Sequence, residues 1–77
     1  MLDLQHFQNG MTTNELRYVR VGAYVRIHPA CDWFMRGVTQ ARVRKVGRKY
    51  LHVTASMGRG VGTNFKLAPC NVLELVQ

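Results

Sequence analysis

Residues 19–27, with the sequence Val-Arg-Val-Gly-Ala-Tyr-Val-Arg-Ile, decide the fold class. The odd-numbered positions are all aliphatic: Val19, Val21, Ala23, Val25 and Ile27. The even-numbered positions are polar, aromatic or glycine. Because side chains of a β-strand point alternately to opposite faces, this period of two predicts a half-buried strand. We expect His28-Pro29 to end it, since proline cannot donate a hydrogen bond to a neighbouring strand.

Four further short strands are expected after this one. Alternating or β-branched segments predict them over residues 38–46, 49–54, 63–67 and 72–75. Gly47-Arg48 has the length and composition of a two-residue hairpin turn. Val43 and Val46 cannot both point inward in a regular strand, so we expect a bulge near Arg44-Lys45. Residues 57–62 predict a glycine-rich turn, and residues 68–71 predict one tight helical turn before the last strand.

Together these segments predict one all-β domain. Short strands separated by turns favour a single five-stranded small barrel over residues 16–77. A chain of 77 residues is too short for a second domain. Residues 1–15 show no sustained period, so we expect a flexible N-terminal arm there, with Met11 as an alternative start.

The order of these elements resembles that of the SH3-like small barrels over about residues 18–76. Residues 21–27 are similar to the opening strand of such barrels, and residues 37–46 to the Gly-x-Val element of KOW-type modules. Residues 43–53 look like the central hairpin of small barrel proteins of bacteria and their phages. Ala23 stands where these barrels commonly have Asp, and the glycine spacing before Val43 is looser than in a KOW motif. The resemblance implies a fold that hosts RNA binders, peptide binders and adaptors.

The composition gives the chain a strong positive charge. Eleven Lys and Arg against four Asp and Glu give a formal net charge of +7 and a pI near 10.3. Such an excess predicts a polyanion or an acidic protein surface as the partner. The sequence has no apolar run of about 20 residues and no secretory signal, so we expect a cytoplasmic protein, in a bacterial or phage-infected host cell.

Basic residues concentrate in the second and third predicted strands. Six of the eleven Lys and Arg lie between residues 36 and 49. Arginine binds phosphate with two hydrogen bonds and exposed aromatic rings stack on bases, so this mixture predicts a nucleic-acid interface. The expected binding residues are Tyr24, Arg26, Trp33, Arg36, Arg42, Arg44, Lys45, Arg48, Lys49, Tyr50 and Arg59. Within this set, phosphate contacts are assigned to Arg42, Arg44, Arg48 and Lys49, and stacking to Tyr24, Trp33 and Tyr50. The alternative is a solvated hairpin whose arginine stems cover apolar surface.

Two predicted loops carry further candidates. We expect Phe34 to close the open end of the barrel and Trp33 to have a partial surface role, as a stacking platform or a protein anchor. Residues 58–62 lack the Gly-Lys-Ser/Thr ending of a phosphate-binding loop and precede no long helix, so nucleotide binding is not expected. Arg59 could still reach a nucleic-acid backbone from this turn, and a plain hairpin turn is the alternative.

No catalytic or metal site is expected. His28, Cys31, His52 and Cys70 are metal-type ligands, but only His28 and Cys31 have a short spacing. The two cysteines do not make a disulfide scaffold, and the four carboxylates are widely separated. We therefore expect no cofactor and no small-molecule substrate.

The function expected from these features is non-catalytic, sequence-tolerant binding of RNA or single-stranded DNA. A second hypothesis is a phage-type adaptor or inhibitor whose basic face binds an acidic host protein such as a polymerase or a nuclease. A third is a structural subunit of a larger assembly. The sequence does not separate the three, and it does not give the oligomeric state.

Overall fold

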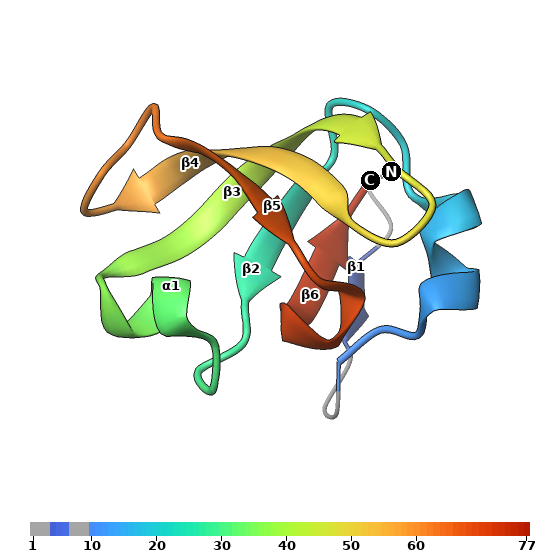
Figure 1. Cartoon of the computed structure of the whole chain (residues 1–77), viewed down its shortest axis with the longest axis horizontal. Coiled ribbons are helices and arrows are strands. Elements are labelled where there is room, and N and C mark those ends of the chain that lie inside the picture. Colours follow the sequence, from blue (N-terminus) through green and yellow to red (C-terminus); the bar gives the residue numbers. More distant parts are fainter. Residues whose placement is uncertain (1–3, 7–9) are drawn as a thin grey trace.

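The computed structural model describes residues 4–6 and 10–77, which form one antiparallel sheet with short helical connections (Figure 1). The strands are β1 (Leu4–His6), β2 (Tyr24–Ile27), β3 (Val38–Val46), β4 (Leu51–Gly58), β5 (Asn64–Leu67) and β6 (Val72–Val76). The helical elements are η1 (Thr13–Tyr18), α1 (Asp32–Met35) and η2 (Pro69–Asn71). The predicted all-β class is confirmed, with β2 to β6 as the five predicted strands and η2 as the predicted helical turn.

The strand order across the sheet is β1-β6-β2-β3-β4-β5. Every pair of neighbours is antiparallel. β1 and β5 are not paired with each other, so the sheet is open and has two edges, whereas a closed barrel would have none. The short strand β1 extends the five-stranded arrangement by pairing with β6.

The hairpin of β3 and β4 is the longest part of the sheet. β3 has the predicted bounds, but β4 continues to Gly58, beyond the predicted end at residue 54. Residues 47–50 connect the two strands, and the Gly47 amide donates a hydrogen bond to the Tyr50 carbonyl (2.9 Å). The predicted two-residue turn at residues 47–48 is therefore wrong, because the pairing stops at Val46 and Leu51.

The predicted bulge is confirmed. The register between β3 and β4 shifts between Val43 and Lys45, which leaves Arg44 as the additional residue on β3. Val43 is buried, whereas Arg44 and Lys45 are both exposed. In a regular strand Val43 and Lys45 would share a face, so the bulge keeps Lys45 out of the core.

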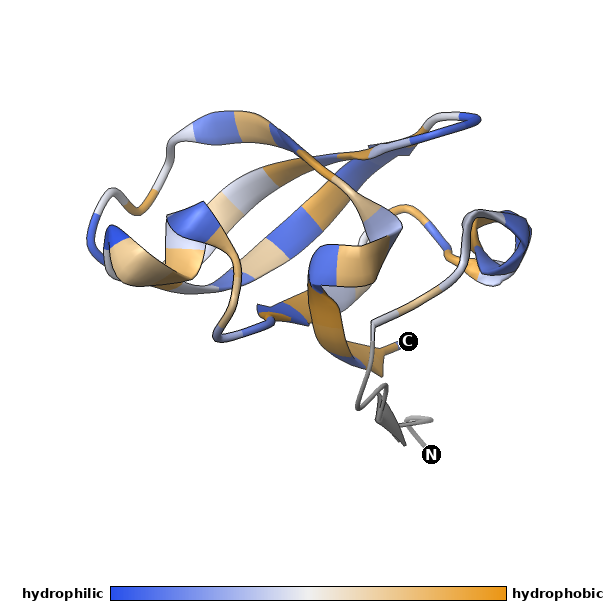
Figure 2. Ribbon diagram, turned by 60° about the horizontal axis from the view of Figure 1, so that its bottom comes forward, coloured by the Kyte–Doolittle hydropathy of each residue, from blue (hydrophilic) through white to orange (hydrophobic). Residues whose placement is uncertain are grey.

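One small core lies on the inner face of the sheet. Figure 2 shows the alternation of hydrophobic and hydrophilic residues along the strands that produces it. Its largest fully buried side chains are Val25, Ile27, Val43, Leu51, Val53, Leu67, Val72 and Leu75. The predicted inward positions on the third and fourth predicted strands, including Leu51 and Phe65, are buried as expected.

The predicted strand over residues 19–27 is too long. Only Tyr24–Ile27 is a strand, and Val21 is 68% exposed although its parity predicted burial. Gly22 has a φ of +94°, a left-handed conformation that interrupts an extended strand and that glycine adopts without steric cost. The Ala23 amide donates to the Arg20 carbonyl, which closes a turn there. Apolar parity alone did not reveal this turn.

The segment that precedes the sheet is packed against it from Gly10 onward. Met11 is only 4% exposed and belongs to the core, and its amide donates to the Pro69 carbonyl (2.9 Å). Leu16, on η1, is also buried. Met11 is within the residues 1–15 for which the sequence predicts a flexible arm, and a single isolated apolar residue gave no period there. For residues 1–3 and 7–9 that prediction lies outside the described residues.

The aromatic residues of the predicted loop before β3 have exchanged roles. Trp33, on α1, packs against the core and stacks on Phe65 of β5, with ring centroids 4.3 Å apart. Phe34 and Met35 are 36% and 74% exposed. The expectation that Phe34 closes the end of the sheet is therefore wrong, and Trp33 does so.

No helix in the described part of the chain is long and apolar enough to span a membrane.

Candidate nucleic-acid interface

The outer face of the sheet, opposite the core, carries a row of side chains that crosses five strands. Its members are register partners from β6 to β5: Val76, Tyr24, Arg42, Thr54 and Asn64. Residues that face each other on neighbouring antiparallel strands have side chains on the same face. The register therefore places an exposed tyrosine beside an exposed arginine in the middle of this face.

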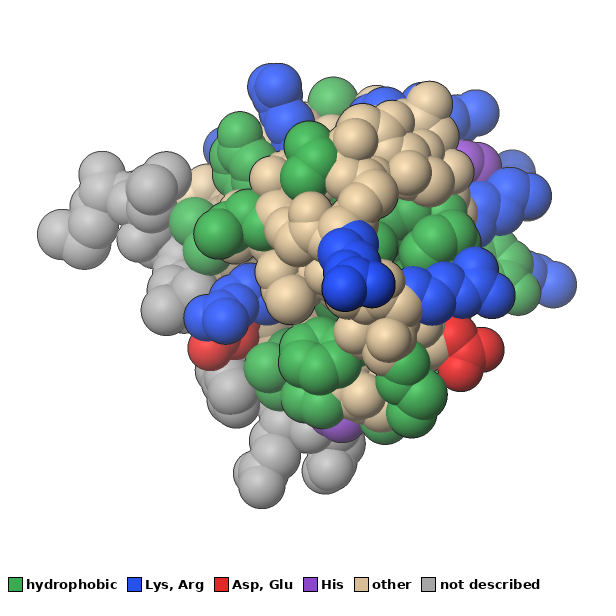
Figure 3. Space-filling view, turned by 90° about the vertical axis from the view of Figure 1, so that its left-hand side faces the viewer, with side chains coloured by type: hydrophobic (Ala, Val, Ile, Leu, Met, Phe, Trp, Pro, Cys, Tyr) green, Lys and Arg blue, Asp and Glu red, His purple; other side chains and the backbone are tan. Residues whose placement is uncertain are grey.

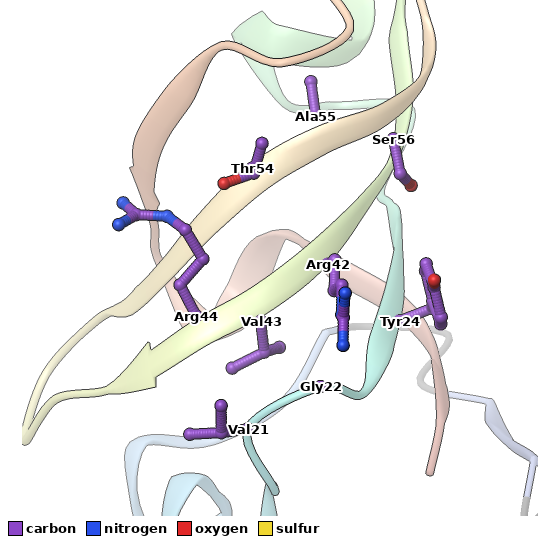
Figure 4. Close-up of a pocket in the computed structure, with 9 residues that line it drawn as sticks. All are labelled: Val21, Gly22, Tyr24, Arg42, Val43, Arg44, Thr54, Ala55 and Ser56. Atoms are coloured by element: carbon purple, nitrogen blue, oxygen red, sulfur yellow. The ribbon is translucent and has the colours of Figure 1, made fainter.

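A groove of about 500 Å³ lies on this face, and we call it the outer-face groove. Its lining residues come from β2, β3, β4 and the turn before β2: Val21, Gly22, Tyr24, Arg42, Val43, Arg44, Thr54, Ala55 and Ser56. Figure 4 shows Arg42 between Tyr24 and Arg44, with Thr54, Ala55 and Ser56 on the neighbouring strand β4. Tyrosine and arginine, the residue types needed for stacking and for phosphate contact, thus lie in one concave surface.

Arg42 lies close to Gly22 in this groove. A Cβ atom at Gly22 would be 3.7 Å from a terminal nitrogen of the Arg42 guanidinium, so that group lies near the Gly22 backbone. The Gly22 amide donates to the Val43 carbonyl (2.8 Å), which holds the turn before β2 against β3. The turn at Gly22 and the Arg42 guanidinium are therefore neighbours in the groove.

The groove also contains hydroxyl groups. Thr54 Oγ1 donates to Asn64 Oδ1 (2.6 Å), whereas Ser56 Oγ is buried and has no hydrogen-bond partner in the described part of the chain. A buried hydroxyl without a partner costs free energy. Because its oxygen is buried, Ser56 Oγ offers no exposed contact to a molecule in the groove.

The electrostatics of this face are positive. Among residues 4–6 and 10–77, no ion pair neutralises Arg42 or Arg44, and no Asp or Glu lines the groove. Arg26 lies farther along β2 and forms an ion pair with Glu74 of β6 (3.6 Å). Arg26 is well exposed, so this pair contributes little stability, but it does reduce the charge that Arg26 offers to a ligand.

The other predicted binding residues lie in two separate places. Lys45, Arg48, Lys49 and Tyr50 lie on or beside the turn between β3 and β4. Trp33, Arg36 and Arg59 lie near α1 and the turn between β4 and β5, at the other end of the molecule (Figures 1 and 3). The structure therefore does not bring the eleven predicted residues into one surface.

Contacts near α1 give Arg36 and Arg59 structural roles. The Arg36 guanidinium lies 4.9 Å from the centre of the Trp33 ring. The Arg59 amide donates to the Gly37 carbonyl (2.9 Å), and a Cβ atom at Gly37 would lie 3.0 Å from Arg59 Cγ. Figure 3 shows this end of the molecule, where basic side chains are spread apart and an apolar patch lies over α1. Arg36 and Arg59 thus each lie against a neighbouring residue at this end of the molecule, Arg36 against Trp33 and Arg59 against Gly37.

Sequence reasoning missed several residues that line the two grooves. Val21, Thr54 and Ser56 line the outer-face groove. The sequence predicted Thr54 only as the last residue of a strand. Arg17 lines a second groove, between η1 and the turn that joins β3 to β4, and it lies just before the strand predicted over residues 19–27. The register with Arg42 could have identified Thr54, but nothing in the sequence distinguished Arg17.

The metal-type ligands are dispersed. In the part of the chain that the structure describes, no group of three or more His, Cys, Asp and Glu could hold a metal ion. Cys31 is buried and Cys70 is exposed, and both are free thiols. His28 Nδ1 accepts a hydrogen bond from the Ala30 amide (3.1 Å), which fixes the turn after β2.

The chain matches no protein-family model, no curated protein and no solved structure in sequence or structure comparisons.

Proposed function

We propose that this chain is a non-catalytic module that binds single-stranded nucleic acid, RNA or DNA, in the outer-face groove. We further propose that its open sheet is a variant of the SH3-like small barrel. The observation that carries the functional proposal is that Tyr24, Arg42 and Arg44 line one groove, which no acidic side chain among the described residues lines.

Each of these side chains has a defined contribution. An exposed tyrosine ring stacks on a base of any identity, which contributes about 1–3 kcal/mol per base and little sequence preference. Arg42 and Arg44 supply guanidinium groups that bind phosphate with paired hydrogen bonds. The net charge of +7 adds long-range attraction, which raises the association rate with any polyanion.

Salt-dependent binding tests the proposal. Fluorescence anisotropy would follow a labelled single strand of about twelve nucleotides, within the range bound by small β-modules. Each phosphate contact on a single strand contributes about −0.7 to the slope of log affinity against log salt concentration. Arg44→Ala should therefore make the slope shallower by about 0.7.

Lys66→Ala is the matched control. Lys66 is also exposed, on β5, but it does not line the outer-face groove, and its replacement removes the same charge. If Arg44→Ala and Lys66→Ala change the salt slope equally, the net charge of the protein alone accounts for the binding. No binding at about 50 mM salt would contradict the proposal and favour the adaptor hypothesis, in which the basic face docks on an acidic protein.

A further inference from the structure

A second basic groove lies between η1 and the turn that joins β3 to β4, and we call it the hairpin groove. It has a volume of about 660 Å³ and is lined by Thr13, Asn14, Leu16, Arg17, Lys45, Val46, Gly47 and Arg48. Figure 1 shows η1 beside this turn, at the end of the molecule opposite α1. Segments about thirty residues apart in the sequence therefore build one concave surface.

Of the residues that the structure describes, three cations line this groove and no carboxylate does. Arg17 comes from η1, and Lys45 and Arg48 come from the hairpin. The nearest acidic residue in the sequence, Glu15, is occupied: its carboxylate accepts hydrogen bonds from the amide and the hydroxyl of Thr12 (2.9 and 3.0 Å). No ion pair within the described residues neutralises the three cations. Like charges gathered in a concavity without a counter-charge raise the local concentration of anions.

Arg17 is held in position. Its Nε donates to the Asn14 carbonyl (3.2 Å), and its guanidinium lies 5.5 Å from the centre of the Tyr18 ring. These contacts leave terminal nitrogens of the guanidinium for a ligand and reduce the conformational entropy that binding would cost. The floor below the cations is aliphatic, from Leu16 and Val46.

The chemistry of the hairpin groove differs from that of the outer-face groove. Among the described residues no aromatic side chain lines it, so they offer no platform for a base. Its cations and the polar side chains of Thr13 and Asn14 suit phosphate oxygens. The outer-face groove contains Tyr24 and can hold a base as well as a phosphate.

The bulge in β3 connects the two grooves. Arg44 lines the outer-face groove and Lys45, the next residue, lines the hairpin groove. Because the register shifts between Val43 and Lys45, both of these consecutive side chains are exposed. A polyanion can therefore pass from one groove to the other over a single residue of backbone.

We infer that the hairpin groove binds the phosphodiester backbone of the same single strand whose base stacks on Tyr24. This inference rests on the proposed function and adds a path: the strand enters the outer-face groove, passes Arg44 and Lys45, and continues between η1 and the hairpin. A strand that fills both grooves contacts more phosphates than a strand held in the outer-face groove alone.

The experiment compares two strand lengths and two neighbouring cations. Oligothymidylates of about four and about twelve residues span the range of site sizes found in small β-modules. Arg48 lines the hairpin groove and Lys49, beside it, does not, so Arg48→Ala and Lys49→Ala remove the same charge from adjacent positions. Amide NMR spectra of the free variants would verify that each one is folded.

We expect Arg48→Ala to make the salt slope shallower by about 0.7 for the long strand and to leave it unchanged for the short one. Lys49→Ala should change the salt slope of the long strand, and that of the short strand, by less than about 0.7. Arg17→Gln, in the other wall, should act as Arg48→Ala does. The long strand should also shift the amide signals of Leu16 and Gly47, and the short strand should shift those of Gly22 and Arg42 only.

Two outcomes would overturn the inference, and they are distinguishable. If Arg48→Ala and Lys49→Ala have equal effects while Arg44→Ala still reduces the slope, the hairpin groove is not part of the path and the proposed function stands. If neither strand binds the unaltered protein, the proposed function and the inference fail together.

Discussion

Tyr24 on β2 and Arg42 on β3 are direct register partners, and their side chains line the same groove on the outer face. The pairing fixes an aromatic ring next to a cation on rigid strands rather than on loops. Contact with a base and contact with its phosphate can therefore be separated experimentally, because stacking releases no counterions and phosphate binding does.

Tyr24→Ala should weaken binding of a single strand by about 1–3 kcal/mol, which is roughly 5- to 150-fold, and should leave the salt slope unchanged. Tyr24→Phe should retain most of the affinity, because the ring is kept. Tyr50→Ala is the control, since Tyr50 is exposed on the turn between β3 and β4 but lines neither groove. Anisotropy titrations at several salt concentrations would measure all three variants. Equal losses for Tyr24→Ala and Tyr50→Ala would contradict the assignment of stacking to the groove.

Trp33→Ala should affect stability and not binding. The Trp33 ring stacks on Phe65 and packs against the core, and such aromatic pairs contribute about 0.5–1.5 kcal/mol beyond their burial. We expect thermal unfolding, followed by circular dichroism, to show a Tm at least 4 °C lower, from about 4–8 °C per kcal/mol in a domain of this size. The affinity of the folded variant for a single strand should stay within about twofold of that of the unaltered protein. A large loss of affinity with an unchanged Tm would indicate that Trp33 contacts the nucleic acid instead of stabilising the fold.

Met11→Ala should destabilise the protein strongly. Met11 is a core residue, and truncating such a methionine to alanine costs about 2–5 kcal/mol. The Tm should fall by at least about 8 °C. Thr13→Ala, two positions on but exposed and without a side-chain hydrogen bond to the described residues, should lower it much less. A melting temperature unaffected by Met11→Ala would contradict the core role of Met11 and would agree with the flexible arm predicted from the sequence.

Gly58→Ala and Gly62→Ala form a matched pair. Both glycines have a φ near +93°, so alanine is strained by about 1–2 kcal/mol at either position. A Cβ atom at Gly58 would overlap the Gly37 carbonyl oxygen, whereas at Gly62 it would meet nothing within 4 Å. Urea denaturation should therefore show a clearly larger loss of unfolding free energy for Gly58→Ala. Equal losses would show that the contact between Gly37 and Gly58 relaxes without cost.

The strands of the fold were largely predictable because burial on one face imposes a period of two. That period predicted β3 with its observed bounds, and the mismatch between Val43 and Val46 predicted the bulge. It failed at Val21, where a turn at Gly22 replaces the strand and the aliphatic side chain points to solvent. Because the turn at Gly22 leaves an apolar residue at every second position, the alternation over residues 19–27 does not reveal it.

The sequence predicted which residues of the candidate site are exposed, but not which of them lie on the same surface. Local alternation indicated that Tyr24, Arg42 and Arg44 point outward, but which outward residues share a surface depends on the strand order. Arg36 and Arg59 lie on connecting segments between strands, beside α1 and in the turn between β4 and β5. The contribution of Arg17 depends on the packing of η1 against the hairpin, a contact between distant segments that no local pattern encodes.

The open sheet affects self-association as well as binding. β5 has a partner strand on one side only within the described residues, so its other edge offers unpaired backbone groups to a second copy of the chain. Its length of four residues, its exposed Lys66 and the mutual repulsion of chains with a net charge of +7 all oppose such pairing. A bound polyanion would cancel that repulsion. Complexes close to electrical neutrality are therefore the condition in which copies of this protein would most readily join edge to edge.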